Sequence, residues 1–301
     1  MKTVAPSYYE KFKCIGGKCK HSCCIGWEID IDEEILEFYK NVGGEFGERL
    51  KSNIEYGDCP HFKLSENERC PFLNENNLCD IIINLGEDKL CEICDSHPRF
   101  RNFYSDRVEI GLGLCCEAAV ELILSTDEKM ALVVISDDGE GEGECDDIDE
   151  AFFAAREEIF AIIQDRNMSI CERLHALQNK FSISFNSLAP SKWVDRFLKF
   201  EMLDSNFGVM LNKLSDDYDA VYCKSENAAE QLLMYFLYRH LPNAIYDGRL
   251  FERIKLSVLS TKMILSLSSA CEIPLTESAR IYSSEIEYSE ENTEKLIDLL
   301  K

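Results

Sequence analysis

The sequence is short of positive charge. Its 301 residues include 32 lysines and arginines against 56 aspartates and glutamates, which gives a formal net charge of −24. A surface of this charge repels a phosphate backbone, so we expect no nucleic-acid partner. A lysine-bearing protein, or a partner with a basic surface, fits the charge better. The acidity is equally compatible with a role in solubility alone.

Long apolar runs are also missing. The longest uninterrupted run, LLMYFLY at residues 232–238, is far shorter than the roughly 18 to 20 residues that a helix needs to span a bilayer. The first residues, MKTVAPSYYEKFKC, contain no apolar stretch of the kind that signal peptides have. The sequence therefore predicts a soluble, cytoplasmic protein with no membrane partner.

Cysteine, by contrast, is abundant and unevenly placed. The chain has 15 cysteines, and 11 of them fall at or before residue 116, where an even distribution would place about 40%. These eleven are Cys14, Cys19, Cys23, Cys24, Cys59, Cys70, Cys79, Cys91, Cys94, Cys115 and Cys116. The other four (Cys145, Cys171, Cys223 and Cys271) are scattered singly, and we expect them to be buried thiols that act as small apolar side chains.

Two alternatives to metal binding explain the N-terminal cysteines poorly. A disulfide framework needs an oxidising compartment, and the total number of cysteines is odd. Each adjacent pair, Cys23–Cys24 and Cys115–Cys116, would also need two separate partners. Buried thiols without a ligand are the second alternative, but they give no reason for the clustering.

Metal binding accounts for the clustering best. Thiolates are soft ligands that suit zinc and iron–sulfur clusters, and the C-x2-C pair of Cys91 and Cys94 places two of them on one turn. The spacing matches neither a zinc finger, a bacterial ferredoxin nor the C-x3-C-x2-C motif of radical S-adenosylmethionine enzymes. The number of sulfurs fits one cluster with spare thiols, or two sites.

The clearest division in the chain is an acidic stretch at residues 136–150, which carries nine acids in fifteen positions. Self-repulsion and glycine predict an exposed loop there. We therefore divide the chain into a cysteine-rich metal-binding domain (1–126), an acidic loop or linker (127–150) and a helical domain (151–301). The stretch VVISDDGEGEG imitates a nucleotide-binding loop, but the segments after it are helical.

Helical patterns dominate the second half and predict a mainly α fold. Apolar residues recur at helical spacing from residue 151, and residues 228–241 are apolar nearly all round, which indicates a buried helix. Arg239 and His240 end that helix, where they could line a pocket or interact with the helix dipole. We expect a loop-rich, cysteine-cluster N-terminal part packed on a helical C-terminal part.

Several motifs resemble the flagellin lysine-N-methylase family. They are KFKCIGGKCKHSCCIGWEIDID, CPFLNENNLCDIIINLGEDKLCEICDSHPRF and LGLCCEAA in the first half, with weaker similarity at QDRNMSICERL and YFLYRHLP. The first half is also similar to cysteine-cluster proteins described as zinc- or iron-chelating. His97 stands where that related pattern has an aromatic residue, so it is either an extra ligand or a neutral replacement.

The resemblance implies a function and its cofactors. It implies S-adenosylmethionine as methyl donor, flagellin as the substrate, and a cysteine-ligated iron–sulfur cluster of the 4Fe–4S type, with zinc as the alternative. The matching cysteines, which it implies as metal ligands, are Cys14, Cys19, Cys23, Cys24, Cys70, Cys79, Cys91, Cys94, Cys115 and Cys116. Cys59 is less clearly part of the pattern.

No residue is marked as catalytic by the sequence alone. Trp27, Phe100 and Tyr104 are candidates for an aromatic wall that binds a methylammonium product, and Arg99 could neutralise a thiolate centre or bind a carboxylate. We take Trp27, Arg99 and Tyr104 as the weak catalytic candidates. A metal-binding or redox-sensing module without methyl transfer is the alternative function.

Overall fold

The computed structural model describes residues 1–139 and 145–301, which fall into two compact units. The smaller unit comprises residues 13–99. The larger unit combines residues 1–12 with residues 100–301. Within the described residues there are fourteen α-helices and six strands, so the predicted mainly helical fold is confirmed.

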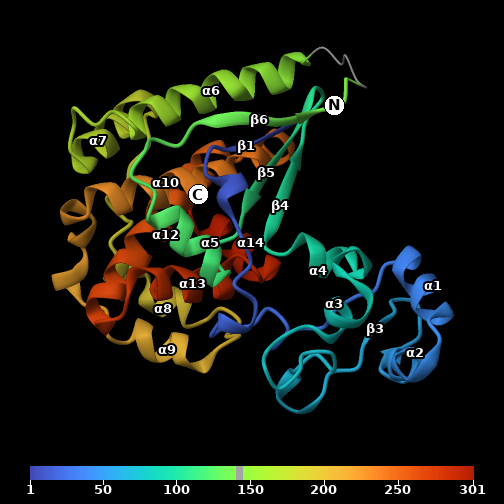
Figure 1. Ribbon diagram of the computed structural model, residues 1–301. Coiled ribbons are helices and arrows are strands. Elements are labelled where there is room, and N and C mark those ends of the chain that lie inside the picture. Colours follow the sequence, from blue (N-terminus) through green and yellow to red (C-terminus); the bar gives the residue numbers. More distant parts are fainter. Residues whose placement is uncertain (140–144) are drawn as a thin grey trace. The chain divides into compact units, whose positions relative to one another are not determined.

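The larger unit contains a four-stranded sheet with the strand order β4-β5-β1-β6. Strand β1 (Lys2–Pro6) pairs in parallel with β5 (Arg107–Leu112) and antiparallel with β6 (Leu132–Asp137), while β4 (Arg99–Phe103) forms the other edge. Figure 1 shows the four strands side by side in this unit. The pairing of β1 explains why the first twelve residues belong to the larger unit.

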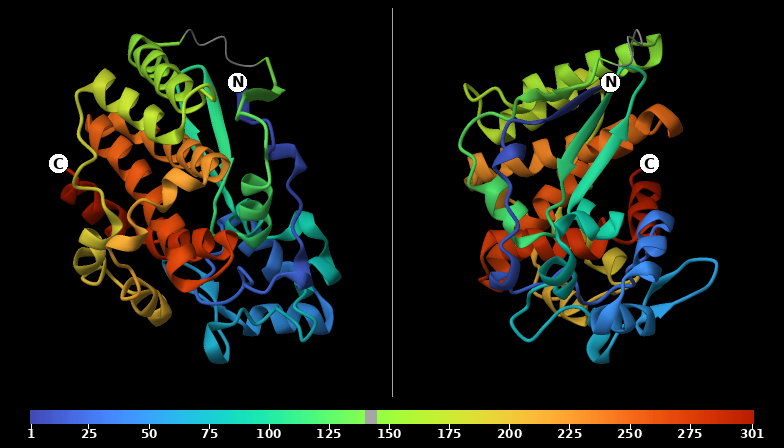
Figure 2. Two further views of the ribbon diagram at one scale, coloured as in Figure 1. Left: turned by 90° about the vertical axis from the view of Figure 1, so that its left-hand side faces the viewer. Right: turned by 45° about the vertical axis from the view of Figure 1, so that its right-hand side comes forward.

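Helices form the rest of the larger unit and hold most of its core. The two central ones, α10 (Glu226–His240) and α12 (Leu250–Cys271), pack against each other, and their side chains are buried on nearly all faces. Figure 2 shows them among the other C-terminal helices. These others are α5 (Glu117–Leu124), α6 (Asp147–Ile163), α7 (Ile170–Phe181), α8 (Val194–Phe197), α9 (Ser205–Leu211), α11 (Ala244–Asp247), α13 (Leu275–Ile286) and α14 (Glu290–Leu299).

Helix α12 is the one described helix that is long and apolar enough to span a membrane, by length and composition. Most of its apolar stretch, 72%, is buried inside the unit. A helix that is apolar on all faces and enclosed by other helices is typical of the core of a soluble protein.

The smaller unit is built from short elements around a core of its own. Its helices are α1 (Glu33–Asn41), α2 (Gly44–Ser52), α3 (Asp80–Leu85) and α4 (Glu92–Ser96), and strand β2 (Ile54–Glu55) pairs with β3 (His61–Phe62). As predicted, Asp32 caps α1: its carboxylate accepts a hydrogen bond from the Ile35 amide. Tyr39, Leu50, Phe62 and Phe72 are fully buried.

The structure differs from the sequence-based predictions in three places. Its compact units do not share the predicted boundaries at residues 126 and 150, and residues 132–137 of the predicted loop form strand β6. Residues 140–144 of that loop lie outside the described residues. The expectation that Cys171 and Cys223 are separate thiols is wrong: they form a disulfide, because α7 and the turn at residues 221–224 lie side by side.

Candidate thiol site

Short elements of the smaller unit bring six cysteines toward one another: Cys23, Cys24, Cys70, Cys79, Cys91 and Cys94. The Cys70 amide donates a hydrogen bond to the Cys24 carbonyl at 2.8 Å, which joins two loops. Cys79 and Cys91 each stand at the residue before a helix, α3 and α4, and Cys94 follows on the first turn of α4. The sequence pattern had linked all six.

Two neighbouring pairs of these thiols share hydrogen bonds. A hydrogen bond with the Cys23 thiol lowers the pKa of Cys24 to about 7, although burial opposes the shift. The hydrogen bond with Cys94 likewise lowers the pKa of Cys91, and it raises the pKa of Cys94. One sulfur of each pair is therefore favoured as the thiolate, which is the form that binds metals.

The buried sulfurs also influence one another through space. Burial raises the pKa of Cys70 to about 12, and the neighbouring sulfurs of Cys24, Cys79 and Cys91 act in the same direction. Burial and the Cys24 sulfur raise the pKa of Cys79. Mutual repulsion of this kind disfavours several thiolates together unless a cation neutralises them.

Tyr39 of α1 contacts this group of thiols. Its hydroxyl donates a hydrogen bond to the Lys89 carbonyl at 2.7 Å and lies 3.8 Å from the Cys91 sulfur. The ring is fully buried and stacks on Phe62. Tyr39 therefore links the apolar core of the unit to the C-x2-C pair.

The donor set fits a thiolate-bound metal by its chemistry, but its geometry is not that of a preformed site. Six sulfurs suit zinc or an iron–sulfur cluster. Across residues 1–139 and 145–301, however, no three histidine, cysteine, aspartate or glutamate side chains have the arrangement that holds a metal ion. Metal binding would therefore require side-chain rotation within the group.

The other four predicted ligands are Cys14 and Cys19 of the smaller unit and Cys115 and Cys116 of the larger unit. Cys14 is exposed, and its sulfur accepts a hydrogen bond from the Gly16 amide. The Cys19 thiol is directed to the His21 carbonyl. Cys115 and Cys116 belong to the larger unit, where Cys116 precedes α5. Cys59, which fits the family pattern less clearly, is exposed beside Asp30.

Two of the three weak catalytic candidates lie in the cysteine-bearing unit. The Trp27 indole donates a hydrogen bond to the Cys23 carbonyl at 2.5 Å, and its ring lies 6.2 Å from that of His97. Burial and the charge of Arg99 lower the pKa of His97 to about 4, so the imidazole is neutral near pH 7. The Arg99 guanidinium donates to the Asp95 carbonyl. Trp27 thus supports the backbone at the first cysteine pair.

The third candidate, Tyr104, lies in the larger unit. Its ring packs against Phe152 and Phe153, and its buried hydroxyl has no hydrogen-bond partner among the described residues. Burial raises the pKa of this hydroxyl. Phe100 packs against Tyr238 and under the Arg239 guanidinium, 5.0 Å from its ring centre. Both aromatic residues are therefore part of a core.

The sequence did not predict a buried polar network around Glu287. The carboxylate of Glu287 contacts Arg239 Nε at 3.1 Å and His240 Nε2 at 2.7 Å, and it accepts a hydrogen bond from the Tyr235 hydroxyl at 2.9 Å. Despite its burial, the pKa of Glu287 is lowered to about 2, with the charge of Arg239 the largest favourable cause and His240 and Ser283 acting in the same direction. In the sequence, only Arg239 and His240 at the end of helix α10 pointed to this network, because a buried charge requires a counter-charge.

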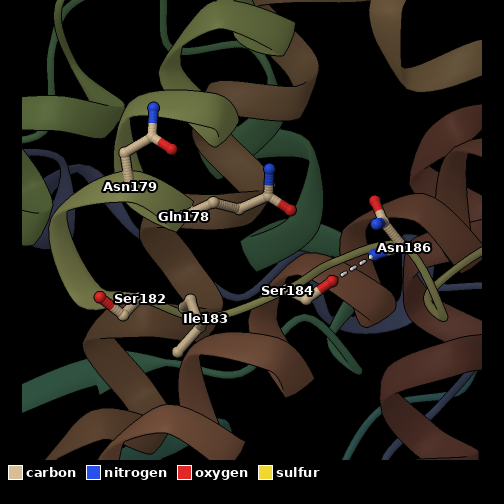
Figure 3. Close-up of a pocket in the computed structure, with 6 residues that line it drawn as sticks. All are labelled: Gln178, Asn179, Ser182, Ile183, Ser184 and Asn186. Carbon is tan, nitrogen blue, oxygen red and sulfur yellow. Dashed lines mark hydrogen bonds between the residues drawn. The ribbon is translucent and has the colours of Figure 1, made fainter.

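Each unit has a cavity among its described residues. The first, of about 390 Å³, lies beside the C-x2-C pair and is anionic. It is lined by Asp32, Glu34, Ile35, Glu87, Asp88, Leu90, Glu92 and Asp95. The second, of about 330 Å³, is polar but uncharged (Figure 3). It is lined by Gln178, Asn179, Ser182, Ile183, Ser184 and Asn186, none of which supplies a general acid or base near pH 7.

Comparison with known proteins gives matches in sequence only. The flagellar biosynthetic protein FliU of Salmonella muenchen is 31% identical over 137 residues, which cover 42% of this chain and 79% of FliU. The chain belongs to the flagellin lysine-N-methylase family. Lysine-N-methylases of Salmonella typhimurium and Salmonella choleraesuis are each 31% identical over 137 residues, or 42% of this chain. No family model and no solved structure matches the chain.

The family relationship has a limited extent. The match spans about a third (33%) of the length of the two lysine-N-methylases, so most of each of those proteins lies outside it. Membership in the flagellin lysine-N-methylase family agrees with the resemblance carried by the cysteine motifs. It does not by itself assign a role to any one sulfur.

Proposed function

We propose that this chain is a cytoplasmic protein-lysine N-methyltransferase that uses S-adenosylmethionine and acts on flagellin. The observation that carries the proposal is the 31% identity to FliU and to two lysine-N-methylases. The net charge of −24 supports a lysine-bearing partner. The proposal also includes a metal centre held by the cysteines of the smaller unit.

The reaction requires a neutral amine. Lysine has a pKa near 10.4, so deprotonation at pH 7 costs about 4.6 kcal/mol. The nitrogen lone pair then attacks the methyl carbon, the carbon–sulfur bond of the sulfonium breaks, and the thioether leaves. The amine proton passes to a base or to solvent. A desolvating site lowers the amine pKa and so reduces this cost.

We propose an iron–sulfur cluster of the 4Fe–4S type, with zinc as the alternative, as the group that the thiols bind. Cys24, Cys70, Cys91 and Cys94 are the ligands we favour, since Cys70 and Cys91 are buried and the sulfurs of Cys91, Cys24 and Cys70 all raise the pKa of Cys94. When bound, the metal would neutralise the thiolates and stabilise the short loops around them. Trp27 and Tyr39 would hold the backbone and the second pair in place.

The experiment is a methyl-transfer assay with purified flagellin and S-adenosylmethionine carrying a labelled methyl group. The proposal predicts label on flagellin lysines, seen as mass increases of one methyl group per site. Absence of transfer together with absence of donor binding would overturn it. A protein that binds metal but not the donor would instead support a metal-binding or redox-sensing module, which the gathered thiols favour as the second candidate.

A further inference from the structure

Residues 216–224 of the larger unit pack only in part against its core, with Val221 and Tyr222 partly buried there. They form two single turns of 3-10 helix, η6 (Asp216–Tyr218) and η7 (Val221–Lys224), and neither turn contains a buried residue. A segment of this kind keeps its place through its connections to neighbouring elements.

Besides this packing, a disulfide and several hydrogen bonds hold the segment. Cys223 is bonded to Cys171 at the start of α7, with the two Cα atoms 5.9 Å apart. Ser266 of α12 donates a hydrogen bond to the Tyr218 carbonyl at 2.8 Å. Ser191 donates to the carboxylates of Asp216 and Asp219, each at 2.7 Å. The disulfide is the one covalent connection among them.

The segment covers a lysine of the core helix. Lys262 lies one turn before Ser266 on α12, its side chain is only 7% exposed, and its amine lies 4.5 Å from the ring centre of Tyr222. Within the described ranges no carboxylate lies close enough to Lys262 for an ion pair. Burial lowers the pKa of this amine to about 8, and the charge of Asp219 only partly offsets the shift. Tyr222, which covers the amine, is the residue before Cys223.

We propose that the Cys171–Cys223 disulfide is a redox-sensitive latch that holds residues 216–224 over Lys262, and that Lys262 is an amine modification site which becomes accessible when the latch opens. Both cysteines are partly exposed, so a small dithiol can reach them. The dithiol supplies two electrons and two protons, the cystine becomes two thiols, and the dithiol becomes a disulfide.

The physical basis is the difference between a covalent and a non-covalent connection. With the disulfide closed, Tyr222 cannot move away from Lys262 without displacing α7 as well. With the disulfide open, the hydrogen bonds, the contact of Lys262 with the Tyr222 ring and the partial packing of Val221 and Tyr222 remain, and these non-covalent contacts can break in local fluctuations. The uncovered amine is then able to attack an acylating reagent. Its lone pair bonds to the acyl carbon, the leaving group departs, and the amine proton is lost to solvent.

The test is the rate of acetylation of Lys262 by an N-hydroxysuccinimide ester, measured by peptide mass spectrometry. One sample of the full chain is alkylated without reduction, and the other is reduced with dithiothreitol and then alkylated. We expect Lys262 to react at least tenfold faster in the reduced sample. Lys199, an exposed lysine of the same unit, should react at the same rate in both.

Matched variants separate the latch from general effects of reduction. The Cys171→Ser/Cys223→Ser variant should show the fast rate without reductant, while Cys271→Ser should behave as wild type, since Cys271 lies outside the disulfide. The double variant is not needed if it fails to fold. The proposal is then tested by the Lys262 rates of reduced and unreduced wild type, together with hydrogen exchange at residues 216–224, which should become faster after reduction. Equal Lys262 rates in the two wild-type samples, or alkylation of Cys171 and Cys223 without reductant, would overturn the proposal.

Discussion

Glu287 is one side chain that fixes the end of a buried helix. Its carboxylate binds Arg239 and His240, the last two residues of α10, and also accepts a hydrogen bond from Tyr235 one turn earlier. Each of these groups would be costly to bury alone. The network therefore makes a polar helix end compatible with an apolar surrounding.

Replacing Glu287 with glutamine should be strongly destabilising. The substitution keeps the shape but leaves the Arg239 charge buried without its counter-charge, for which we expect a loss of about 3–5 kcal/mol in the free energy of unfolding. Urea denaturation followed by circular dichroism measures the difference. Glu291→Gln, at an exposed ion pair with Lys295, is the matched control and should unfold as wild type. Equal stability of the two variants would contradict this account of the network.

The same network predicts a loss of stability in acid. Burial keeps the pKa of His240 below its usual 6.5, so the unfolded state takes up this proton first as the pH falls through 6.5. The Glu287 pKa is lowered to about 2, so its contribution is complete above its ordinary pKa of 4.5 and is lost as the pH falls toward 2. Both pKa shifts therefore lower the free energy of unfolding as the pH falls. The free energy of unfolding should fall between pH 7 and pH 3, first through His240 and then through Glu287; a free energy of unfolding that stays constant over this range would argue against it.

At the scale of single residues, the sequence predicts some of the side chains that contact one another and misses others. Arg239 and His240 stand out because they end an apolar run, whereas Glu287 lies 47 residues from His240 in an ordinary acidic stretch. All six gathered cysteines belong to the predicted ligand set, because the sequence spaces them closely within one short unit. That they bind a metal stays a prediction. The disulfide between Cys171 and Cys223 was not, because 52 residues separate them.

At the scale of elements, Asp32 joins the first helix of the smaller unit to the C-x2-C turn. One carboxylate oxygen caps α1 through the Ile35 amide at 3.1 Å, and the other accepts a hydrogen bond from the Glu92 amide at 2.8 Å. Glu92 is the first residue of α4 and directly follows Cys91. The sequence predicted that Asp32 caps α1, but the hydrogen bond from the Glu92 amide could be found only in the folded structure.

Replacing Asp32 with alanine should loosen both helices. Loss of the cap costs about 1–2 kcal/mol, and the freed α4 amide should let Cys91 and Cys94 react faster with iodoacetamide. Peptide mass spectrometry after timed alkylation measures this rate. The control is Asp204→Ala, which removes a comparable cap from α9 in the larger unit and should leave both cysteine rates unchanged. Equal rates in the two variants would show that Asp32 does not hold the turn.

At the scale of the molecule, the two units are stabilised by different means. The larger unit has an extended apolar core that includes α10 and α12. The core of the smaller unit comprises twelve buried residues, two of which are the cysteines Cys70 and Cys91. A unit with so small a core commonly needs a disulfide or a metal as an additional support.

At the same scale, the mainly helical fold class was predictable from the helical periodicity of the apolar residues. The unit boundaries were not, because β1 pairs with strands more than a hundred residues away.

The measurement that tests the central claim most directly is the metal content of the chain purified without oxygen. We predict a brown protein with iron and sulfide, or a colourless one with zinc. The variant Cys24→Ser/Cys70→Ser/Cys91→Ser/Cys94→Ser should lose the metal, while Cys271→Ser should retain it. A wild-type chain without metal, or equal metal content in the four-serine variant and the wild type, would contradict the claim that these sulfurs form a metal centre.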